Sequence, residues 1–229
     1  MEAQFKAIAD HALLVIFAEQ ISEEAHAKVV ALDKALGVDT PIGIIETVPA
    51  LVNLLVSFDP MATDHISVQR HVRRCLNGLK TEGIAGERHI VHVCYEPPFS
   101  PNLHTVATAT GLSAEAVINA HLAGEFKALM YGFAPGYAYL AGVPEHIQVP
   151  RKQTPVRDVP AGSVIIAGPQ CLITTLTMPT GWSIIGRSPT PVFTGDPKHP
   201  FLFYVGDTVV FERVDCTIFE RLRAGGNNG

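Results

Sequence analysis

Residues 131–189 read YGFAPGYAYLAGVPEHIQVPRKQTPVRDVPAGSVIIAGPQCLITTLTMPTGWSIIGRSP, and this stretch decides the fold. Glycine and proline recur in it at spacings too irregular for a helix and too dense for an ordinary sandwich. Proline fixes φ and glycine tolerates positive φ, so the stretch predicts many tight turns. Loops on a rigid scaffold hold most binding chemistry. Turns that carry aromatic residues and single arginines are therefore candidates for a site.

The C-terminal half as a whole predicts a mainly β domain. Two short helices are expected first, at residues 101–110 and 113–127, separated by Gly111 and with Ser113 capping the second. Short β-type runs then follow, with turn signals between them: SVIIAG, CLITTLT, WSIIG, FLFYV and DTVVFERV. Many short strands without long intervening helices indicate a closed barrel or a sandwich.

The N-terminal half predicts an α+β domain. The expected elements are a strand at 12–18, a helix from Ser22 to Gly37, strands at 42–48 and 51–58, a helix at 64–79 and a strand at 89–95. Asp10 and His11 fall in a turn before the first strand, and Pro49–Ala50 is expected to turn the hairpin. The order βαββαβ is that of the ferredoxin-like plan. We therefore expect domains at residues 1–95 and 96–229, with a disordered tail at about 224–229.

Composition excludes several classes of function. The net charge is −5 and the pI is about 6.0, and no run of lysine or arginine suggests a nucleic-acid partner. No segment approaches the roughly 20 apolar residues that span a bilayer, and the N-terminus does not resemble a signal peptide. The four cysteines are scattered without a CxxC pair, which is typical of free thiols in a reducing cytoplasm.

Recognisable catalytic motifs are missing. His89 and His92 stand three apart on a predicted strand and so point to opposite faces, which argues against a shared metal ion. No phosphate-binding loop is present, and Ser163 and Cys171 lack the surroundings of a nucleophile. A role in catalysis would therefore depend on positioning a substrate, without a covalent intermediate.

The candidates for binding and proton transfer lie in or near the glycine-rich stretch. His121 precedes it on a predicted helix, as a core or capping histidine or as a proton-transfer group. Arg151 and Arg187 lie in loops and could hold a carboxylate bidentately, or be surface arginines. The aromatic residues could line a pocket or fill the core: Tyr131, Phe133, Tyr137, Tyr139 and Trp182.

The motifs in this stretch resemble those of the allophanate hydrolase subunit 1 family, which includes the B subunit of 5-oxoprolinase and Kip-type inhibitors of a histidine kinase. The motifs that carry the resemblance occur at 132–140, 150–152, 159–164, 167–170 and 179–188. DHALLVIF and ETVPALVNLLVSFDP in the N-terminal half are also similar to that family. The resemblance covers nearly the whole chain.

The resemblance implies an N-terminal α+β domain and a cyclophilin-like β-barrel. It also implies a second cyclophilin-like subunit as partner, of the type of allophanate hydrolase subunit 2 or the C subunit of 5-oxoprolinase, and a third subunit in some complexes. Such complexes open 5-oxoproline or cleave a urea-derived amide. No covalently bound cofactor is implied, and ATP would be used by the assembled complex.

The chain departs from the family pattern at several positions. The family's TGxYP is replaced by Cys171–Thr175, and its double glycine before tryptophan by Thr180–Gly181. Val156 stands where an arginine is usual, with Arg157 displaced by one position. Asn102 replaces an aspartate, and Lys152 replaces the second arginine of PRR. Because a bidentate site does not tolerate such exchanges freely, they bear on the substrate more than on the fold.

We therefore expect a cytoplasmic subunit of a hetero-oligomeric, ATP-dependent amide or lactam hydrolase that forms half of a composite active site. His121 would handle protons. The substrate would be bound by Tyr131, Phe133, Pro135, Gly136, Tyr139, Arg151 and Arg187. No metal, nucleic acid or membrane is expected to take part. The alternative is a Kip-like inhibitor that docks on a sensor histidine kinase, while prolyl isomerase activity would rest on fold analogy alone.

Overall fold

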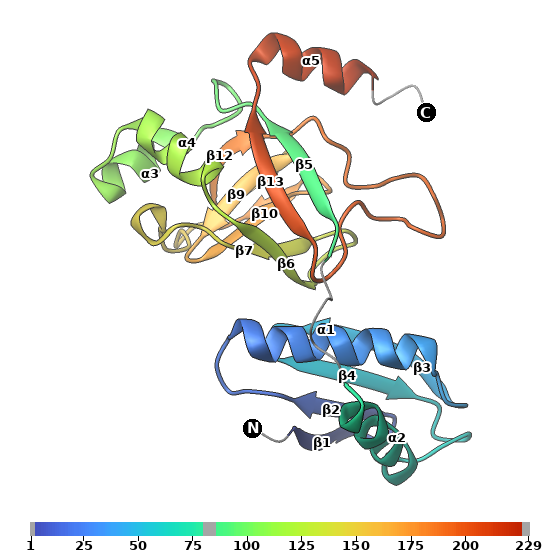
Figure 1. Cartoon of the computed structure of the whole chain (residues 1–229). Coiled ribbons are helices and arrows are strands. Elements are labelled where there is room, and N and C mark those ends of the chain that lie inside the picture. The colour runs from blue at the N-terminus through green and yellow to red at the C-terminus, as the bar shows by residue number, and fades with distance from the viewer. Residues whose placement is uncertain (1–2, 80–85, 226–229) are drawn as a thin grey trace. The chain divides into compact units, whose positions relative to one another are not determined.

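The computed structural model describes residues 3–79 and 86–225, which form two compact units divided between residues 85 and 86 (Figure 1). The first unit contains β1 (Gln4–Ala9), β2 (Ala12–Ile16), α1 (Glu23–Val38), β3 (Ile44–Ala50), β4 (Asn53–Phe58) and α2 (His65–Asn77). The division precedes the boundary expected at residue 95, because the strand predicted at 89–95 belongs to the second unit.

The sheet of the first unit has the strand order β1-β2-β4-β3, with every pair antiparallel. Both helices pack on it and enclose a core that includes Val15, Val29, Leu54 and Val72. The βαββαβ prediction was wrong in its last strand. The edge position beside β2 is occupied by β1 instead. The side chains of β1 are mostly exposed, so its sequence has no clear apolar pattern from which the strand could be predicted.

The predicted ends of the first unit's elements are partly confirmed. The Ser22 hydroxyl accepts a hydrogen bond from the Ala25 amide, as expected of an N-cap, but α1 continues past Gly37 to Val38. The hairpin turns at Leu51–Val52, since Pro49 and Ala50 are still paired in β3. Leu51 has a φ of 23°, the left-handed conformation that the tight turn requires.

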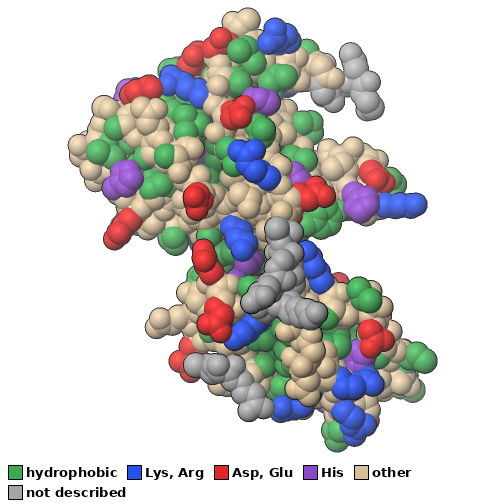
Figure 2. Space-filling model, viewed as in Figure 1, with side chains coloured by type: hydrophobic (Ala, Val, Ile, Leu, Met, Phe, Trp, Pro, Cys, Tyr) green, Lys and Arg blue, Asp and Glu red, His purple; other side chains and the backbone are tan. Residues whose placement is uncertain are grey.

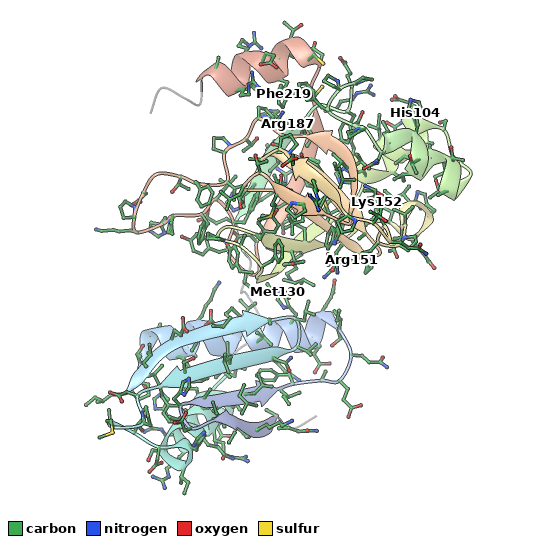
Figure 3. The ribbon with its side chains drawn as sticks, turned by 180° about the vertical axis from the view of Figure 1, so that it is seen from behind. His104, Met130, Arg151, Lys152, Arg187 and Phe219 are labelled. Atoms are coloured by element: carbon green, nitrogen blue, oxygen red, sulfur yellow. The ribbon has the colours of Figure 1, made fainter. Side chains whose placement is uncertain are left out.

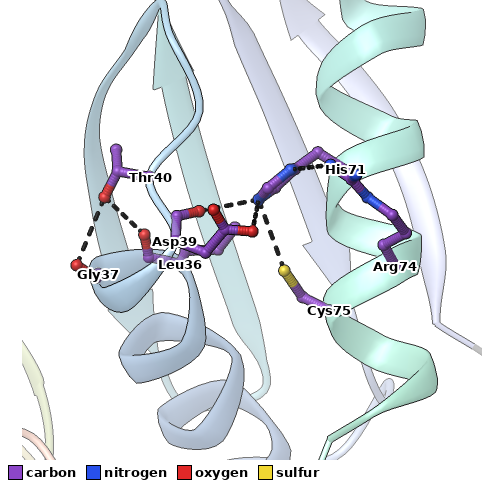
Figure 4. A network of polar contacts seen from close by, with 7 residues as sticks. All are labelled: Leu36, Gly37, Asp39, Thr40, His71, Arg74 and Cys75. Carbon is purple, nitrogen blue, oxygen red and sulfur yellow. Dashed lines mark hydrogen bonds and ion pairs between the residues drawn. The ribbon is translucent and has the colours of Figure 1, made fainter.

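A buried histidine joins the two helices of the first unit, and the sequence did not reveal it. His71 Nε2 donates to the Asp39 carbonyl oxygen at 2.9 Å, beyond the C-terminus of α1 (Figure 4). Arg74 donates to His71 Nδ1 at 2.6 Å, and this contact fixes the tautomer of the ring. The Nε2 bond therefore links the end of α1 to α2, while the Nδ1 contact lies within α2.

The second unit is built on a seven-stranded sheet with the order β12-β9-β10-β7-β6-β13-β5. Its strands are β5 (Arg88–Val93), β6 (Phe126–Tyr131), β7 (Ala138–Ala141), β9 (Ser163–Ala167), β10 (Gln170–Ile173), β12 (Ser183–Arg187) and β13 (Thr208–Arg213). The two edge strands approach each other, and the backbones of Cys94 and Arg187 exchange hydrogen bonds of 2.8 and 2.9 Å. This bridge makes the sheet a nearly closed barrel, as expected from the short strands and dense turns (Figure 1).

The helices of the second unit are α3 (Leu103–Thr110), α4 (Ala114–Leu122), the short 3-10 helix η1 (Glu145–Ile147) and α5 (Cys216–Gly225). Gly111 ends α3 with a φ of 70°, and Ser113 caps α4, both as predicted. The second helix ends at Leu122, not at residue 127, because β6 already begins at Phe126. FLFYV forms no strand beyond an isolated bridge, and Ala224–Gly225 complete α5. Residues 226–229 of the expected disordered tail lie outside the described residues.

Strand β9 is buried on both faces. Val164 and Ile166 of β9 point into the interior core, whereas Ile165 points outward into a second apolar cluster. A two-stranded ribbon of β8 (Val156–Val159) and β11 (Met178–Thr180) covers part of that outer face. The outer cluster consists of Tyr137, Val159, Ile165, Ala167, Leu172, Trp182 and Ile184.

On the face shown in Figure 2, basic and acidic side chains are interspersed over the second unit, and several basic side chains gather at the lower right of the first unit. Among the helices of residues 3–79 and 86–225, none has the length and apolar character needed to cross a membrane.

Candidate functional site

A pocket of about 290 Å³ lies on the outer face of the barrel, and we refer to it as the outer pocket. Its floor is formed by Ile165 of β9 and Leu172 of β10, the outward-facing residues of the sheet. The other lining residues are Phe133, Tyr137, Tyr139, Arg151, Lys152, Pro155, Pro179, Thr180, Gly181 and Trp182. All of these residues come from the glycine- and proline-rich stretch, which the sequence predicted as the site.

Aromatic rings and a guanidinium group make up the walls of the outer pocket. The guanidinium carbon of the exposed Arg151 lies 5.5 Å from the centre of the Trp182 ring. Tyr139 meets the same indole edge-on, with ring centres 5.9 Å apart. Stacking on Trp182 holds the arginine side chain along the wall while its donors stay free to meet a ligand.

Lys152 supplies a second positive charge at the outer pocket. Its Nζ donates to Asn102 Oδ1 at 2.6 Å and to the Trp182 carbonyl oxygen at 2.9 Å. Asn102 Oδ1 also accepts from the Ile184 amide, so the side chain ties the start of α3 to β12. Burial lowers the pKa of Lys152. Two of the departures from the family pattern, Asn102 and Lys152, are therefore direct partners, which their separation in sequence concealed.

Four of the predicted substrate-binding residues border a shallower hollow next to the outer pocket: Tyr131, Phe133, Pro135 and Gly136. Phe133 is 75% exposed, has a φ of 72° and borders both depressions. Gly136 has a φ of 73°, and a side chain there would press on Thr175 and Phe201, so its role is to shape the turn. The Tyr131 hydroxyl is buried without a hydrogen-bond partner among the described residues, and burial raises its pKa.

Arg187 does not share the outer pocket with Arg151, so the predicted joint grip on one carboxylate was wrong (Figure 3). Arg187 ends β12 at the barrel-closing bridge and lines a separate cavity of about 260 Å³. Its Nε donates to the Ala161 carbonyl oxygen at 3.1 Å, and its guanidinium lies 5.9 Å from the Phe99 ring. Phe219 of α5 lines the same cavity.

His121 is a core residue, which corrects its proposed role in proton transfer. The ring is 0% exposed and packs between Phe126 and Phe211 in the barrel interior. The Tyr95 hydroxyl and its Nδ1 share a hydrogen bond of 2.8 Å, and its Nε2 lies 3.5 Å from Cys171 Sγ. Burial lowers the pKa of His121 to about 3. A neutral imidazole enclosed in this way meets no substrate that arrives from solvent.

The structure thus brings together Phe133, Tyr139 and Arg151 and separates them from His121 and Arg187. Tyr137, Lys152 and Trp182 complete the pocket, although they were not among the selected site residues. Tyr137 and Trp182 are among the aromatic candidates of the sequence, and the signal for Lys152 is its place as the second of two adjacent basic residues in the PRK motif.

Fold and pocket together define a class: a small α/β unit followed by a barrel-like unit that offers an open, cationic and aromatic pocket on its outer face. The chain belongs to the family described as carboxyltransferase domain, subdomain C and D, whose model matches residues 3–203. It is 34% identical over 222 residues to the B subunit of 5-oxoprolinase from Bacillus subtilis (strain 168), an alignment that covers 92% of each chain.

Solved structures support the same fold. The structure of TTHA0988 matches with a TM-score of 0.81 and 32% identity over 90% of this chain. The match spans only 40% of TTHA0988, which is a much longer polypeptide. Urea amidolyase of K. lactis matches 99% of this chain with a TM-score of 0.80, but this chain spans 16% of that enzyme. At 16% identity, the second likeness shows the fold alone.

Proposed function

We propose that this chain is one subunit of an ATP-dependent amide or lactam hydrolase of the 5-oxoprolinase or allophanate hydrolase type, and that the outer pocket is its half of a composite active site. The observation that carries the proposal is the chemistry of the pocket lining. Arg151 stacks on Trp182 and Lys152 adds a second positive charge, whereas no carboxylate, imidazole or thiol is among the described lining residues. Such a surface suits a small planar substrate with a carboxylate.

Hydrolysis of an amide requires proton transfer to the leaving nitrogen, and the titratable groups of the pocket are two tyrosines and Lys152, whose ammonium is already bound to Asn102 and the Trp182 carbonyl oxygen. We assign this part to a second cyclophilin-like subunit, of the type of the 5-oxoprolinase C subunit or allophanate hydrolase subunit 2. A third subunit, with ATP used by the assembled complex, would supply activation. Similarity to the B subunit of 5-oxoprolinase over 92% of both chains supports 5-oxoproline as the first substrate to test.

The test is reconstitution with the cognate second and third subunits and measurement of ATP-dependent glutamate release from 5-oxoproline. The variant Arg151→Ala is expected to raise KM by about 10–100-fold, which corresponds to loss of a charge-assisted hydrogen bond of roughly 1.5–3 kcal/mol. Arg157→Ala is the matched control, because Arg157 is exposed on β8 and is not a lining residue of the pocket. Equal KM values for Arg151→Ala and Arg157→Ala would show that the outer pocket does not bind the substrate. Absence of turnover with both 5-oxoproline and allophanate would overturn the proposed activity.

The second candidate is a Kip-like regulator that docks on a sensor histidine kinase. The observation in its favour is Phe133, which is 75% exposed at the rim of the pocket and is the kind of aromatic anchor that interfaces use. Autophosphorylation of the cognate kinase would then fall when the chain is added and recover with Phe133→Ser. Unchanged autophosphorylation would exclude this function.

A further inference from the structure

Two cysteines far apart in sequence meet where the barrel closes. Cys94 follows β5 and forms the closing bridge with Arg187, while Cys216 is the first residue of α5. Their Sγ atoms are 3.6 Å apart. A carboxylate oxygen of Glu96 completes a group whose three ligand atoms all lie within 4.8 Å of one another. The sequence, in which the four cysteines look scattered, predicted no such cluster.

The spacing of these atoms suits a tetrahedral metal ion. Two thiolates bound to zinc at about 2.3 Å each stand roughly 3.8 Å apart, close to the separation seen here. Cys94 is fully buried, whereas Cys216 and Glu96 are half-buried, so an ion has a path in from one side. Phe99, Val214 and Phe219 pack around the two cysteines as an apolar shell.

The cluster also concentrates groups that become negative, which a cation would stabilise. A metal ion binds the thiolate form of cysteine, so two thiolates and the Glu96 carboxylate would offer it three negatively charged ligands. Free cysteine thiols are largely protonated at neutral pH. A divalent ion replaces two protons: each S–H bond is exchanged for a metal–sulfur bond, and two protons are released to solvent.

We propose that Cys94, Glu96 and Cys216 form a binding site for a thiophilic divalent metal ion, with Zn²⁺ as the expected occupant and a solvent molecule as the fourth ligand. The ion would fasten the start of α5 to the barrel-closing bridge. Phe219 and Arg223 of α5 line the cavity that contains Arg187, so the metal would also fix one wall of that cavity. The proposal is independent of the hydrolase assignment.

The experiment uses the full chain, reduced and freed of metal, in a competition titration between the protein and a chromophoric zinc chelator. Wild type is expected to bind one equivalent of Zn²⁺ and to release two protons. Cys216→Ser and Glu96→Gln should weaken binding by at least the factor of about 10–100 that loss of a supporting ligand interaction costs. Cys75→Ser is the matched control, because Cys75 is a half-buried thiol in the first unit.

A second readout tests whether the thiols themselves bind the ion, since the chain also contains 10 histidines. Co²⁺ in place of Zn²⁺ should give the thiolate-to-cobalt charge-transfer band and the visible spectrum of tetrahedral cobalt in wild type and Cys75→Ser, but not in Cys216→Ser. Equal Zn²⁺ affinity of wild type and Cys216→Ser would overturn the proposal. So would a cobalt spectrum without sulfur character, or a Cys94–Cys216 disulfide that persists in the reduced preparation.

Discussion

The two faces of the barrel sheet use similar residues for different purposes. Val164 and Ile166 of β9 face the buried interior of the barrel, together with His121 and Phe126. Ile165 of the same strand faces outward, where only the ribbon of β8 and β11 and a few aromatic side chains cover it. The incomplete cover leaves room for a pocket with Arg151 and Lys152 at its edge. His121 on the inner face is therefore shielded from solvent, whereas Arg151 and Lys152 on the outer face can meet a ligand.

The strongest test of this difference compares one leucine from each face. Leu140 is 0% exposed in the interior, and Leu172 is 1% exposed in the floor of the outer pocket. Each Leu→Ala change is expected to cost about 2–5 kcal/mol in the free energy of unfolding, since a buried side chain of the same size is lost. Urea denaturation measures both. Only Leu172→Ala should also raise KM of the reconstituted complex, and an equal rise with Leu140→Ala would mean that the faces are not functionally distinct.

The next largest effect is expected at the closure of the barrel. A Cβ at Gly186 would lie 2.7 Å from Val93 Cγ1 and 3.0 Å from the Cys94 carbonyl oxygen. Gly186→Ala should therefore destabilise the second unit by about 1–3 kcal/mol through overpacking. Gly78→Ala is the control, because a Cβ there meets no atom within 4 Å. Thermal unfolding that shifts equally for the two variants would show that the edges of the sheet are not tightly joined.

Much of the fold was predictable because local chemistry marks it. The caps at Ser22 and Ser113, and the turn glycine Gly111, act within one helical turn, and all three were located correctly. The assignment of β5 to the sheet of the second unit was not predictable in this way. β5 pairs with β13, more than a hundred residues later, and nothing within RHIVHV distinguishes that partner from the sheet of the first unit. Burial on both faces likewise hides which residues of β9 face the pocket.

The candidate site was predicted as a region more successfully than as a set of residues. Turn chemistry located the stretch that lines the outer pocket, because glycine and proline act on their own backbone. Whether Arg187 joins Arg151 depends on the direction in which β12 leaves the pocket, and this is set by its pairing with β9. The burial of His121 depends on Phe126 and Phe211, which come from two other elements. Contacts of that kind leave no pattern along the chain.

The inner face can be tested through pH. The folded pKa of His121 is about 3, below the ordinary value of 6.5, so the unfolded chain binds a proton that the folded chain does not as the pH falls below 6.5. Wild type should therefore lose roughly 2 kcal/mol more than His121→Gln between pH 7 and pH 5. Urea denaturation at the two pH values gives this difference, and the glutamine amide can still form a hydrogen bond with the Tyr95 hydroxyl. Parallel losses would mean that the imidazole titrates normally in the folded protein.

The smallest expected effect concerns the outer face, where solvent screens the charges. Lys152→Met keeps the apolar stem and removes the donors to Asn102 Oδ1 and to the Trp182 carbonyl oxygen. The loss should be about 1 kcal/mol in the free energy of unfolding. Asn102 still accepts from the Ile184 amide, and Lys152 is only half-buried, so solvent can replace part of the lost interaction. Lys198→Met, at an exposed loop lysine, is the control and should leave stability unchanged. If Lys152→Met cost as much as Leu172→Ala, the ammonium would be a structural group of the barrel, and Arg151 alone would remain to bind an anionic substrate in the outer pocket.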